Sequence, residues 1–488
     1  MVFSSPIFLF AFLPLVLLAY YLSPRTVKNY TLLIASLLFY AWGEVFYVGI
    51  MITSIISNYI FGRLIYSASE NSSASNQDER FSAKLYVSIG IIINIGLLIS
   101  FKYANFITDN INSFTALFDI TPVELAPVHL PLGISFFTFQ AISYIVDVYR
   151  KEVVAQKNLP DLALYISLFP QLIAGPIVRY HDVSSQITDR SHSLELFASG
   201  VQRFIFGLSK KMLIANPLGE VADNIFALSG NDLTMPLAWL GIIAYSLQIF
   251  FDFSGYSDMA IGLGRMFGFR FLENFNYPYI SRSLREFWRR WHISLSTWFK
   301  DYVYIPMGGG RVSTLLVYRN LFTVFLLTGV WHGANWNFIV WGLFHGAFLA
   351  SEHMGFSKIL ERSWKPIQHL YLILVVSISW VFFRADSLSE AITYLHSMLD
   401  FSNIHTTSMQ YAQVTTNEFI YALGAGLVLS VPIYGQLKNM IAAINQRSTV
   451  LYATIYYIPR LTLLLTLLYL SAFKIAASTY NPFIYFRF

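Results

Sequence analysis

The stretch Thr328-Gly-Val-Trp-His-Gly-Ala-Asn-Trp336 places one histidine, His332, between two strongly apolar segments, residues 321–327 and 338–344. Apolar segments of this kind are typical of helices that cross a membrane. An ionisable side chain at membrane depth is costly unless it faces a cavity or a partner, so it marks a functional site by default. His332 is therefore the most informative position of the chain.

The composition indicates a membrane protein. Hydrophobic residues make up 56% of the 488 residues and charged residues only 12%, against about 25% charged in soluble proteins. Residues 7–22, 31–46, 48–65, 86–101, 132–148, 162–177, 237–255, 338–350, 370–383, 419–431 and 461–476 form apolar runs. Since one crossing takes roughly 20 residues, we predict an all-α polytopic membrane protein with about ten to twelve transmembrane helices. Some runs are short enough to be re-entrant, and no composition break divides residues 1–488 into more than one domain.

The residue types that are missing narrow the chemistry. The chain contains no cysteine, which excludes disulfides, thiolate metal sites and a cysteine nucleophile. It also lacks the His-Glu-x-x-His zinc motif and the Gly-x-Ser-x-Gly serine elbow, so we predict no metal site. Neutral imidazole accepts a proton near physiological pH, which makes His332 the leading candidate for acid–base catalysis. The alternative is a buried histidine that only satisfies hydrogen bonds of the core.

The residues next to His332 in the sequence indicate that it faces a cavity. Irregular backbone at membrane depth is tolerated only where it lines a cavity or is buried in protein, and Gly329 and Gly333 permit such backbone. Trp331 and Trp336 are candidate walls of the cavity, and Asn335 is a candidate substrate contact.

Polar residues inside other apolar runs support the same interpretation. Gln140 and Asp252 are candidate substrate-binding residues on this ground. The alternative is that intramembrane carboxylates pair with arginines such as Arg265 and fix helix packing. We favour this alternative for Asp258 and leave Asp252 open.

A second landmark is the segment 281–301, which contains Arg-Glu-Phe-Trp-Arg-Arg-Trp-His at positions 285–292. Its apolar residues follow helical spacing and its other positions are rich in arginine, which predicts one helix in the cytoplasmic membrane interface. The simpler interpretation is a lipid anchor. The more specific interpretation is recognition of a phosphorylated substrate, because guanidinium groups suit phosphate geometry. The candidate arginines are Arg282, Arg285, Arg289, Arg290 and the nearby Arg311. His292 falls at the edge of the apolar stripe, where it points into a groove or serves as a structural histidine.

The distribution of lysine and arginine indicates how the chain is oriented across the membrane. Arg25 and Lys28 follow the first apolar run, whereas residues 103–130 and 385–416 contain no lysine or arginine. By the positive-inside rule the first loop is cytoplasmic and the two uncharged stretches are outside. The formal net charge of +5 therefore reflects orientation and contact with the lipid bilayer. Nothing in the chain indicates a nucleic-acid partner.

The chain resembles the membrane-bound O-acyltransferase (MBOAT) family, and within it the bacterial branch that includes the membrane subunit of alginate O-acetyltransferase. The resemblance spans nearly the whole chain and shows no departure at His292 or His332. The matching stretches are Phe-Pro-Gln-Leu-Ile-Ala-Gly-Pro (169–176), Phe-Asp-Phe-Ser-Gly-Tyr-Ser-Asp (251–258), Asn-Phe-Asn-Tyr-Pro (274–278), Phe-Trp-Arg-Arg-Trp-His-Ile-Ser-Leu-Ser (287–296), Gly-Val-Trp-His-Gly-Ala-Asn (329–335) and Asn-Pro-Phe-Ile-Tyr-Phe-Arg-Phe (481–488).

The resemblance implies a ring of tilted helices around a central tunnel, in the inner membrane of a bacterium. His332 would be the family's near-invariant catalytic histidine, and His292 would occupy its second, less uniform position. Acetyl-coenzyme A would enter from the cytoplasm as a co-substrate, with no bound cofactor. The acetyl group would pass to an extracytoplasmic partner protein that O-acetylates a polysaccharide such as alginate.

Three other functions stay open at this stage. Peptidoglycan O-acetylation differs only in the acceptor, and D-alanyl transfer to teichoic acid would use a carrier protein as the donor. A transporter of another class would use the polar residues to line a substrate path. Transporters often contain internal repeats, and none is evident in this sequence.

Overall fold

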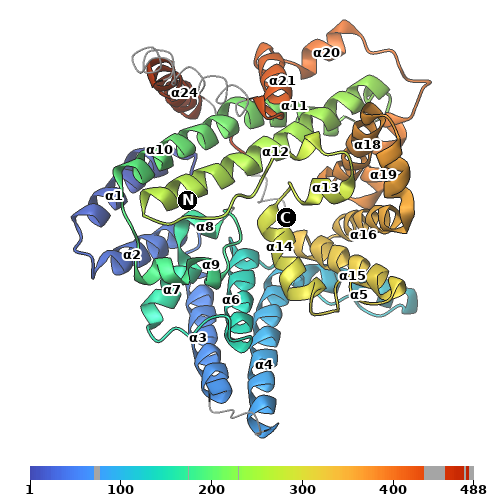
Figure 1. Cartoon of the computed structure of the whole chain (residues 1–488). Coiled ribbons are helices and arrows are strands. Elements are labelled where there is room, and N and C mark those ends of the chain that lie inside the picture. Colours follow the sequence, from blue (N-terminus) through green and yellow to red (C-terminus); the bar gives the residue numbers. More distant parts are fainter. Residues whose placement is uncertain (71–76, 174, 229, 434–456, 478–479, 483–488) are drawn as a thin grey trace. The chain divides into compact units, whose positions relative to one another are not determined.

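The computed structural model describes residues 1–488 apart from 71–76, 174, 229, 434–456, 478–479 and 483–488 (Figure 1). The regular elements among these described residues are helices, without a strand. The chain divides into two compact units, Met1–Val201 with Ala260–Leu272 and Gln202–Met259 with Glu273–Phe488. The single domain expected for residues 1–488 stays a prediction.

The first unit is built around three helices, α3, α4 and α6, which pack against one another. Its elements are η1 (Phe8–Phe12), α1 (Leu13–Leu22), α2 (Lys28–Ala41), α3 (Val48–Glu70), α4 (Gln77–Lys102), α5 (Ala104–Thr115), η2 (Ala116–Phe118), α6 (Ile134–Tyr149), α7 (Leu159–Ser167), α8 (Phe169–Leu172), α9 (Tyr180–Thr188) and the first part of α10 (Leu194–Ser209).

The second unit contains the candidate active site, and its closest helix pair is α15 and α16. Its elements are η3 (Lys210–Ala215), α11 (Asn216–Phe226), η4 (Gly230–Asp232), most of α12 (Met235–Met266), η5 (Pro278–Ile280), α13 (Leu284–Trp288), α14 (Ile293–Phe299), η6 (Lys300–Tyr304), α15 (Thr314–His332), α16 (Trp336–Ser351), η7 (Glu352–Phe356), α17 (Ser357–Arg362), α18 (Lys365–Arg384), α19 (Leu388–Met398), α20 (Ser408–Val414), α21 (Asn417–Leu429) and α24 (Ile458–Ala477).

Six helices of the described part of the chain are long and apolar enough to cross a membrane. They are Val48–Ser69, Phe81–Lys102, Met235–Met266, Thr314–His332, Lys365–Arg384 and Ile458–Ala477. Shorter apolar helices cover Phe8–Leu22, Ile134–Tyr149 and Asn417–Leu429. The prediction of an all-α polytopic membrane protein is confirmed, while the full number of crossings stays a prediction.

One predicted crossing is divided in the structure. The apolar run 162–177 contains the end of α7 at Ser167 and the separate short helix α8, which has Pro170 in its first turn. Proline has no backbone N–H and its ring clashes with the preceding helical turn, so α7 cannot continue through this position. The expectation of one continuous helix over this run is wrong.

The glycines of α15 have a different role from the predicted one. Gly329 lies inside the continuous helix α15, where a Cβ atom would collide with the carbonyl oxygen of Phe338 on α16. A Cβ atom at Gly342 of α16 would collide with the carbonyl oxygen of Phe325 in the same way. Small residues allow two membrane helices to approach until their backbones touch. Gly329 therefore provides close helix packing and not irregular backbone.

We expect Gly329→Ala to lower the thermal unfolding midpoint of the purified protein. Alanine favours a helix over glycine by about 1 kcal/mol, but overpacking costs about 1–3 kcal/mol. The matched control is Gly424→Ala in α21, where a Cβ atom meets nothing within 4 Å. That control should keep or raise the midpoint. Equal midpoints for the two variants would show that the contact between α15 and α16 does not limit stability.

Candidate active site

His332 is the last residue of α15, and the chain leaves the helix directly after it. Gly333 has an extended backbone with φ −164°, and its N–H donates to the carbonyl oxygen of Gly329 at 3.4 Å. The ring of Phe338 occupies the space that a Cβ atom at Gly333 would need. The His332 side chain is buried at the turn between α15 and α16. The predicted departure from helix thus begins at Gly333.

Three aromatic rings surround His332. The ring centroids of Trp331, Trp341 and Phe383 each lie 5.0 Å from the imidazole centroid, and all three ring planes are steeply inclined to it. Trp331, Trp341 and Phe383 are themselves buried. These contacts hold the imidazole in one orientation and keep bulk water away from it. A fixed, dry imidazole suits a general base.

The two tryptophans predicted to line a cavity around His332 have different surroundings in the structure. Trp331 contacts His332, whereas Trp336 is the first residue of α16 and is 52% exposed. Trp341 and Phe383 are the wall residues that the sequence did not single out. Trp341 lies within an apolar run that already favoured a helix, and Phe383 comes from α18, about fifty positions away, so neither gave a local signal.

Asn335 holds the turn after His332 in place. Its side chain caps α16 by accepting from the N–H of Asn337 at 3.3 Å, and its Nδ2 donates to the carbonyl oxygen of Asp386 at 3.0 Å. Asn337 Nδ2 donates to the neighbouring carbonyl of Ala385 at 2.7 Å. These bonds connect the turn to the beginning of the stretch 385–416 that lacks lysine and arginine.

The segment 281–301 is not one helix. It consists of α13, a break at His292 and α14. His292 has φ +43°, a left-handed conformation that a non-glycine residue rarely adopts. The prediction that His292 lies at the edge of an apolar stripe on one continuous helix is therefore wrong.

Asn274 fixes the break at His292. Its Oδ1 accepts from the backbone N–H of Ser294 at 3.1 Å and from the Ser294 hydroxyl at 2.9 Å, and it lies 3.2 Å from His292 Nδ1. Its Nδ2 donates to the Ser257 hydroxyl at 3.0 Å. Its carbonyl oxygen also accepts from Ile293 N–H at 2.9 Å. One asparagine thus closes the turn and orients the second predicted histidine.

The environment of His292 keeps its imidazole neutral. The side chain is buried, and burial lowers the pKa of His292 to about 3. Its ring lies 4.5 Å from the ring of Phe253 and 6.3 Å from the ring of Trp331, centroid to centroid. Trp331 therefore contacts both candidate histidines.

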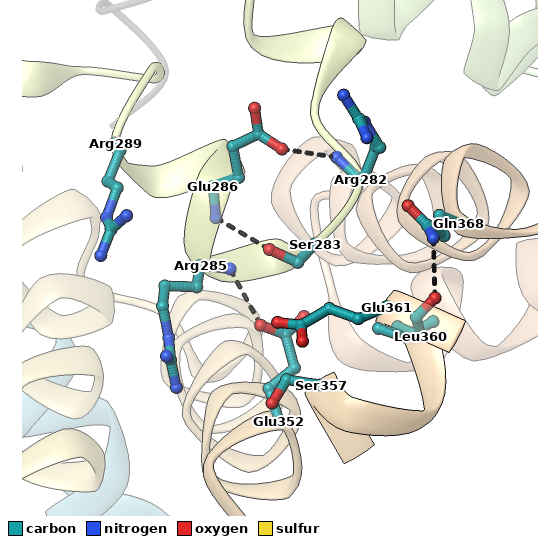
Figure 2. A pocket seen from close by; sticks show the side chains of 10 residues that line it. All are labelled: Arg282, Ser283, Arg285, Glu286, Arg289, Glu352, Ser357, Leu360, Glu361 and Gln368. Carbon is teal, nitrogen blue, oxygen red and sulfur yellow. Dashed lines mark hydrogen bonds between the residues drawn. The ribbon is translucent and has the colours of Figure 1, made fainter. Parts of the chain in front are cut away.

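Three predicted arginines line one pocket. Arg282, Arg285 and Arg289 belong to α13 and its flanks and border a cavity of about 310 Å³. The other lining residues are Ser283, Glu286, Glu352, Ser357, Leu360, Glu361 and Gln368. Figure 2 shows the side chains of Arg285 and Arg289 pointing to the same side of α13. We call this cavity the arginine pocket.

The guanidinium groups of the arginine pocket share its lining with Glu286, Glu352 and Glu361. Within the described residues, Arg282, Arg285 and Arg289 form no ion pair. Arg290 differs, because its side chain pairs with Glu286 at 2.9 Å. Arg311 follows the glycine turn 308–310 and is not part of the pocket lining. Three carboxylates line the same pocket, but Glu286 pairs with Arg290 and Glu352 accepts from backbone N–H groups, so the three guanidinium groups keep donors that suit an anionic ligand.

Glu352 holds the arginine pocket together. This buried carboxylate accepts from the N–H groups of Leu284 at 2.6 Å and Arg285 at 3.1 Å and from the hydroxyl of Tyr371 at 3.2 Å. It joins the end of α16 to the beginning of α13 (Figure 2). Sequence reasoning missed Glu352, although a lone carboxylate at the end of an apolar run could have drawn attention to it.

The intramembrane carboxylates are paired. Asp252 forms a buried ion pair with Lys211 at 2.6 Å. Asp258 pairs with Arg203 and with Lys210, each at 2.6 Å. Asp258 therefore has the structural role that the sequence favoured, with different partners from the suggested Arg265.

Gln140 is buried in α6 of the first unit. Its backbone carbonyl accepts from the hydroxyls of Ser143 at 2.8 Å and Tyr165 at 3.3 Å. It therefore belongs to the packing around α6, and its substrate-binding role stays a prediction.

One group of side chains among the described residues has the composition of a metal site. Ligand atoms of Asp147, Glu152 and His181 in the first unit lie within 4.8 Å of one another. His181 Nδ1 is 2.8 Å from Asp147, and its Nε2 is 3.3 Å from Asp182. Hydrogen bonds to Asp147 and then Asp182 raise the pKa of His181 to about 9. The printed contacts therefore describe an ion-paired cluster of His181 with Asp147 and Asp182.

Comparison with known proteins identifies the family. Residues 133–391 match the family model for MBOAT, the membrane-bound O-acyltransferase family. The chain is 42% identical to the probable alginate O-acetylase AlgI of Azotobacter vinelandii over the full length of both. It is 34% identical to the peptidoglycan O-acetyltransferase of Helicobacter pylori, over 100% of this chain and 98% of the relative. The teichoic acid D-alanyltransferase of Bacillus subtilis is 30% identical over 51% of this chain and 66% of its own length.

The chain belongs to the membrane-bound O-acyltransferase family. The resemblance found in its motifs is confirmed, and the protein is an O-acyltransferase. This activity argues against the transporter alternative.

We expect Asn274→Ala and His292→Ala to lower activity to a similar extent, because Asn274 acts through the position of His292. Combining the two substitutions should cause little further loss, since residues that act as one unit are not additive. Steady-state acyl transfer by the purified variants measures the effect, with thermal midpoints as the check on folding. Losses that multiply in the double variant would show that Asn274 has a separate role.

The His181 cluster predicts a pH-dependent stability. The folded-state pKa of about 9 lies above the unfolded value of about 6.5. The stabilisation of the fold by protonated His181 is therefore complete below about pH 6.5, and it is lost as the pH rises through about 9. We expect the difference in thermal midpoint between the wild type and His181→Gln to shrink over this range. A difference that does not depend on pH would contradict the charged pairing with Asp147 and Asp182, beside the more distant Glu152.

Proposed function

We propose that this protein transfers an acetyl group from acetyl-coenzyme A to a hydroxyl acceptor on the extracytoplasmic side of the bacterial inner membrane. The observation that carries the proposal is that the two functional groups lie at opposite ends of one helix, α16. His332 precedes α16, and Glu352 of the arginine pocket follows it. The 16 residues of α16 separate the two ends by about 24 Å. An anion-binding pocket and a base at this separation suit a donor whose charged end is far from its reacting end.

The arginine pocket is the proposed binding site for the phosphates of coenzyme A. Three guanidinium groups that form no ion pair among the described residues suit a ligand with several phosphate groups. The positive-inside rule puts this arginine-rich segment at the cytoplasmic face, where acetyl-coenzyme A is available. Arg290 contributes less, because Glu286 already neutralises it. Arg311 lies outside the pocket and has no assigned contact with the donor.

His332 is the proposed general base. Its imidazole takes the proton from the acceptor hydroxyl, whose oxygen then attacks the thioester carbonyl carbon. The carbon–sulfur bond breaks, the acetyl group leaves on the acceptor oxygen, and the proton passes to the thiolate of coenzyme A. The aromatic enclosure excludes water that would otherwise hydrolyse the thioester. His292, held neutral by burial and in contact with Trp331, has an assisting role.

The proposed acceptor is an exopolysaccharide of the alginate type, reached through an extracytoplasmic partner protein. The supporting observation is that the full-length relatives include several probable alginate O-acetylases at 40–42% identity. Peptidoglycan is the second candidate, because its O-acetyltransferase in Helicobacter pylori also matches this chain over its full length. D-alanyl transfer has weaker support, since that relative matches only about half of the chain.

We expect purified wild-type protein to cleave radiolabelled acetyl-coenzyme A and His332→Ala to lose about 10²–10⁴-fold in rate, the usual contribution of a general base. The variant should keep its thermal midpoint and its elution volume in gel filtration. The matched control is His396→Ala, a histidine on the exposed face of α19, which should retain full activity.

Two outcomes would contradict different parts of the proposal. A wild type that does not cleave acetyl-coenzyme A would show that the donor is another thioester. A His332→Ala variant with the wild-type rate would show that another group is the base.

A further inference from the structure

Two buried N–H groups of α16 lack an acceptor. Trp341 and His345 are 1% and 0% exposed. Within the described part of the chain, neither Trp341 Nε1 nor His345 Nε2 has a hydrogen-bond partner. Native proteins pair nearly all of their buried polar groups, so each exception needs a physical reason. Here two exceptions occur on neighbouring side chains, whose ring centroids are 4.8 Å apart.

The contact with Trp288 determines which nitrogen of His345 carries the proton. Trp288 Nε1 lies 3.4 Å from His345 Nδ1 and bonds to it. An indole N–H can only donate, so Nδ1 of His345 accepts and the proton of the neutral ring is on Nε2. His345 Nε2 is therefore a donor, as Trp341 Nε1 is. Both groups need an acceptor, and neither can satisfy the other.

These two donors lie between the arginine pocket and His332. Trp341 contacts the His332 ring at 5.0 Å between centroids. His345 contacts Trp288 at 5.1 Å, and Trp288 belongs to α13 together with Arg285 of the arginine pocket. Along α16, His345 is seven residues from Glu352, or about 10 Å, and Trp341 is eleven residues, or about 16 Å. A donor molecule that spans from the pocket to His332 passes this pair.

We propose that Trp341 and His345 bind carbonyl oxygens of the acyl donor between its phosphates and its reacting thioester. This inference rests on the function proposed above. The pantetheine arm of acetyl-coenzyme A contains two amide carbonyls and ends in the thioester carbonyl, and all of these are acceptors without a competing charge. Two N–H donors in an apolar aromatic setting match a long neutral arm that contains a few carbonyl groups.

The surroundings of the two donors suit this ligand and not a charged one. The rings that contact His345 belong to Trp288, Phe325, Trp341 and Phe344. A phosphate or carboxylate would lose its hydration there without gaining a countercharge. A neutral amide or thioester loses less hydration and gains one hydrogen bond from each N–H.

The central test compares His345→Leu with His345→Gln. Leucine fills the site without a donor, whereas the glutamine amide restores an N–H near the position of Nε2. We expect His345→Leu to raise KM for acetyl-coenzyme A, or to lower kcat, by about tenfold, as loss of one buried hydrogen bond predicts. His345→Gln should recover most of this loss. The assay uses the purified full chain, and thermal midpoints accompany each rate.

Two acyl-donor compounds distinguish which carbonyl group His345 binds. Acetyl-coenzyme A has the complete arm, and S-acetyl-N-acetylcysteamine has only the thioester and the amide next to it. A defect in KM limited to acetyl-coenzyme A assigns His345 to the far amide of the arm. A defect with both compounds assigns it to the thioester end. Both results support binding of a donor carbonyl.

A tryptophan control distinguishes binding from packing. Trp341→Phe should raise KM or lower kcat in the same way as His345→Leu. Trp239→Phe should leave both constants unchanged, because the Trp239 N–H already donates to the carbonyl oxygen of Met398 at 2.9 Å. If the wild type is active and His345→Leu and Trp341→Phe keep its KM and kcat, the inference is overturned while the proposed function stands. A wild type without acetyl-coenzyme A cleavage overturns both.

Discussion

The contact between the backbones of α15 and α16 is the constraint on which the catalytic unit depends. At Gly329 and Gly342 the carbonyl of the facing helix occupies the space of a side chain. Membrane helices gain little from the hydrophobic effect when they associate in lipid, so this close packing supplies the attraction. It also sets the distance from His332, at the end of one helix, to Trp341 on the other. The His332 imidazole is thus placed by backbone contact and not by a flexible loop.

A second consequence is that one rigid helix connects both ends of the site. The N-terminus of α16 is tied by Asn335 and Asn337 to the segment after α18. The residue after its C-terminus, Glu352, binds the first N–H groups of α13. A helix keeps a constant rise per residue, so the separation along the backbone between His332, the proposed base, and the arginine pocket does not depend on side-chain conformations. Binding at one end can therefore present a thioester at the other.

The sequence predicted the features that depend on local composition. The runs 48–65, 86–101 and 370–383 became α3, α4 and α18, because the length and hydropathy of a segment decide whether it forms an apolar helix. His332 was found because an ionisable residue stands out in an apolar run. The break at His292 was not predictable, because the residue that enforces it is Asn274, eighteen positions earlier. Glu352 escaped notice for the same reason, since its role depends on backbone groups of Leu284 and Arg285.

The charged residues separate into two kinds once their partners are known. Asp252 with Lys211 and Asp258 with Arg203 are compensated within the protein, as buried charges must be. The guanidinium groups of Arg282, Arg285 and Arg289 line one pocket and form no ion pair among the described residues. A sequence shows which residues are charged but not which are paired, and pairing is what distinguishes a packing residue from a ligand-binding one. By this criterion Asp252 and Asp258 are packing residues, and the arginine pocket is the proposed ligand-binding site of this unit.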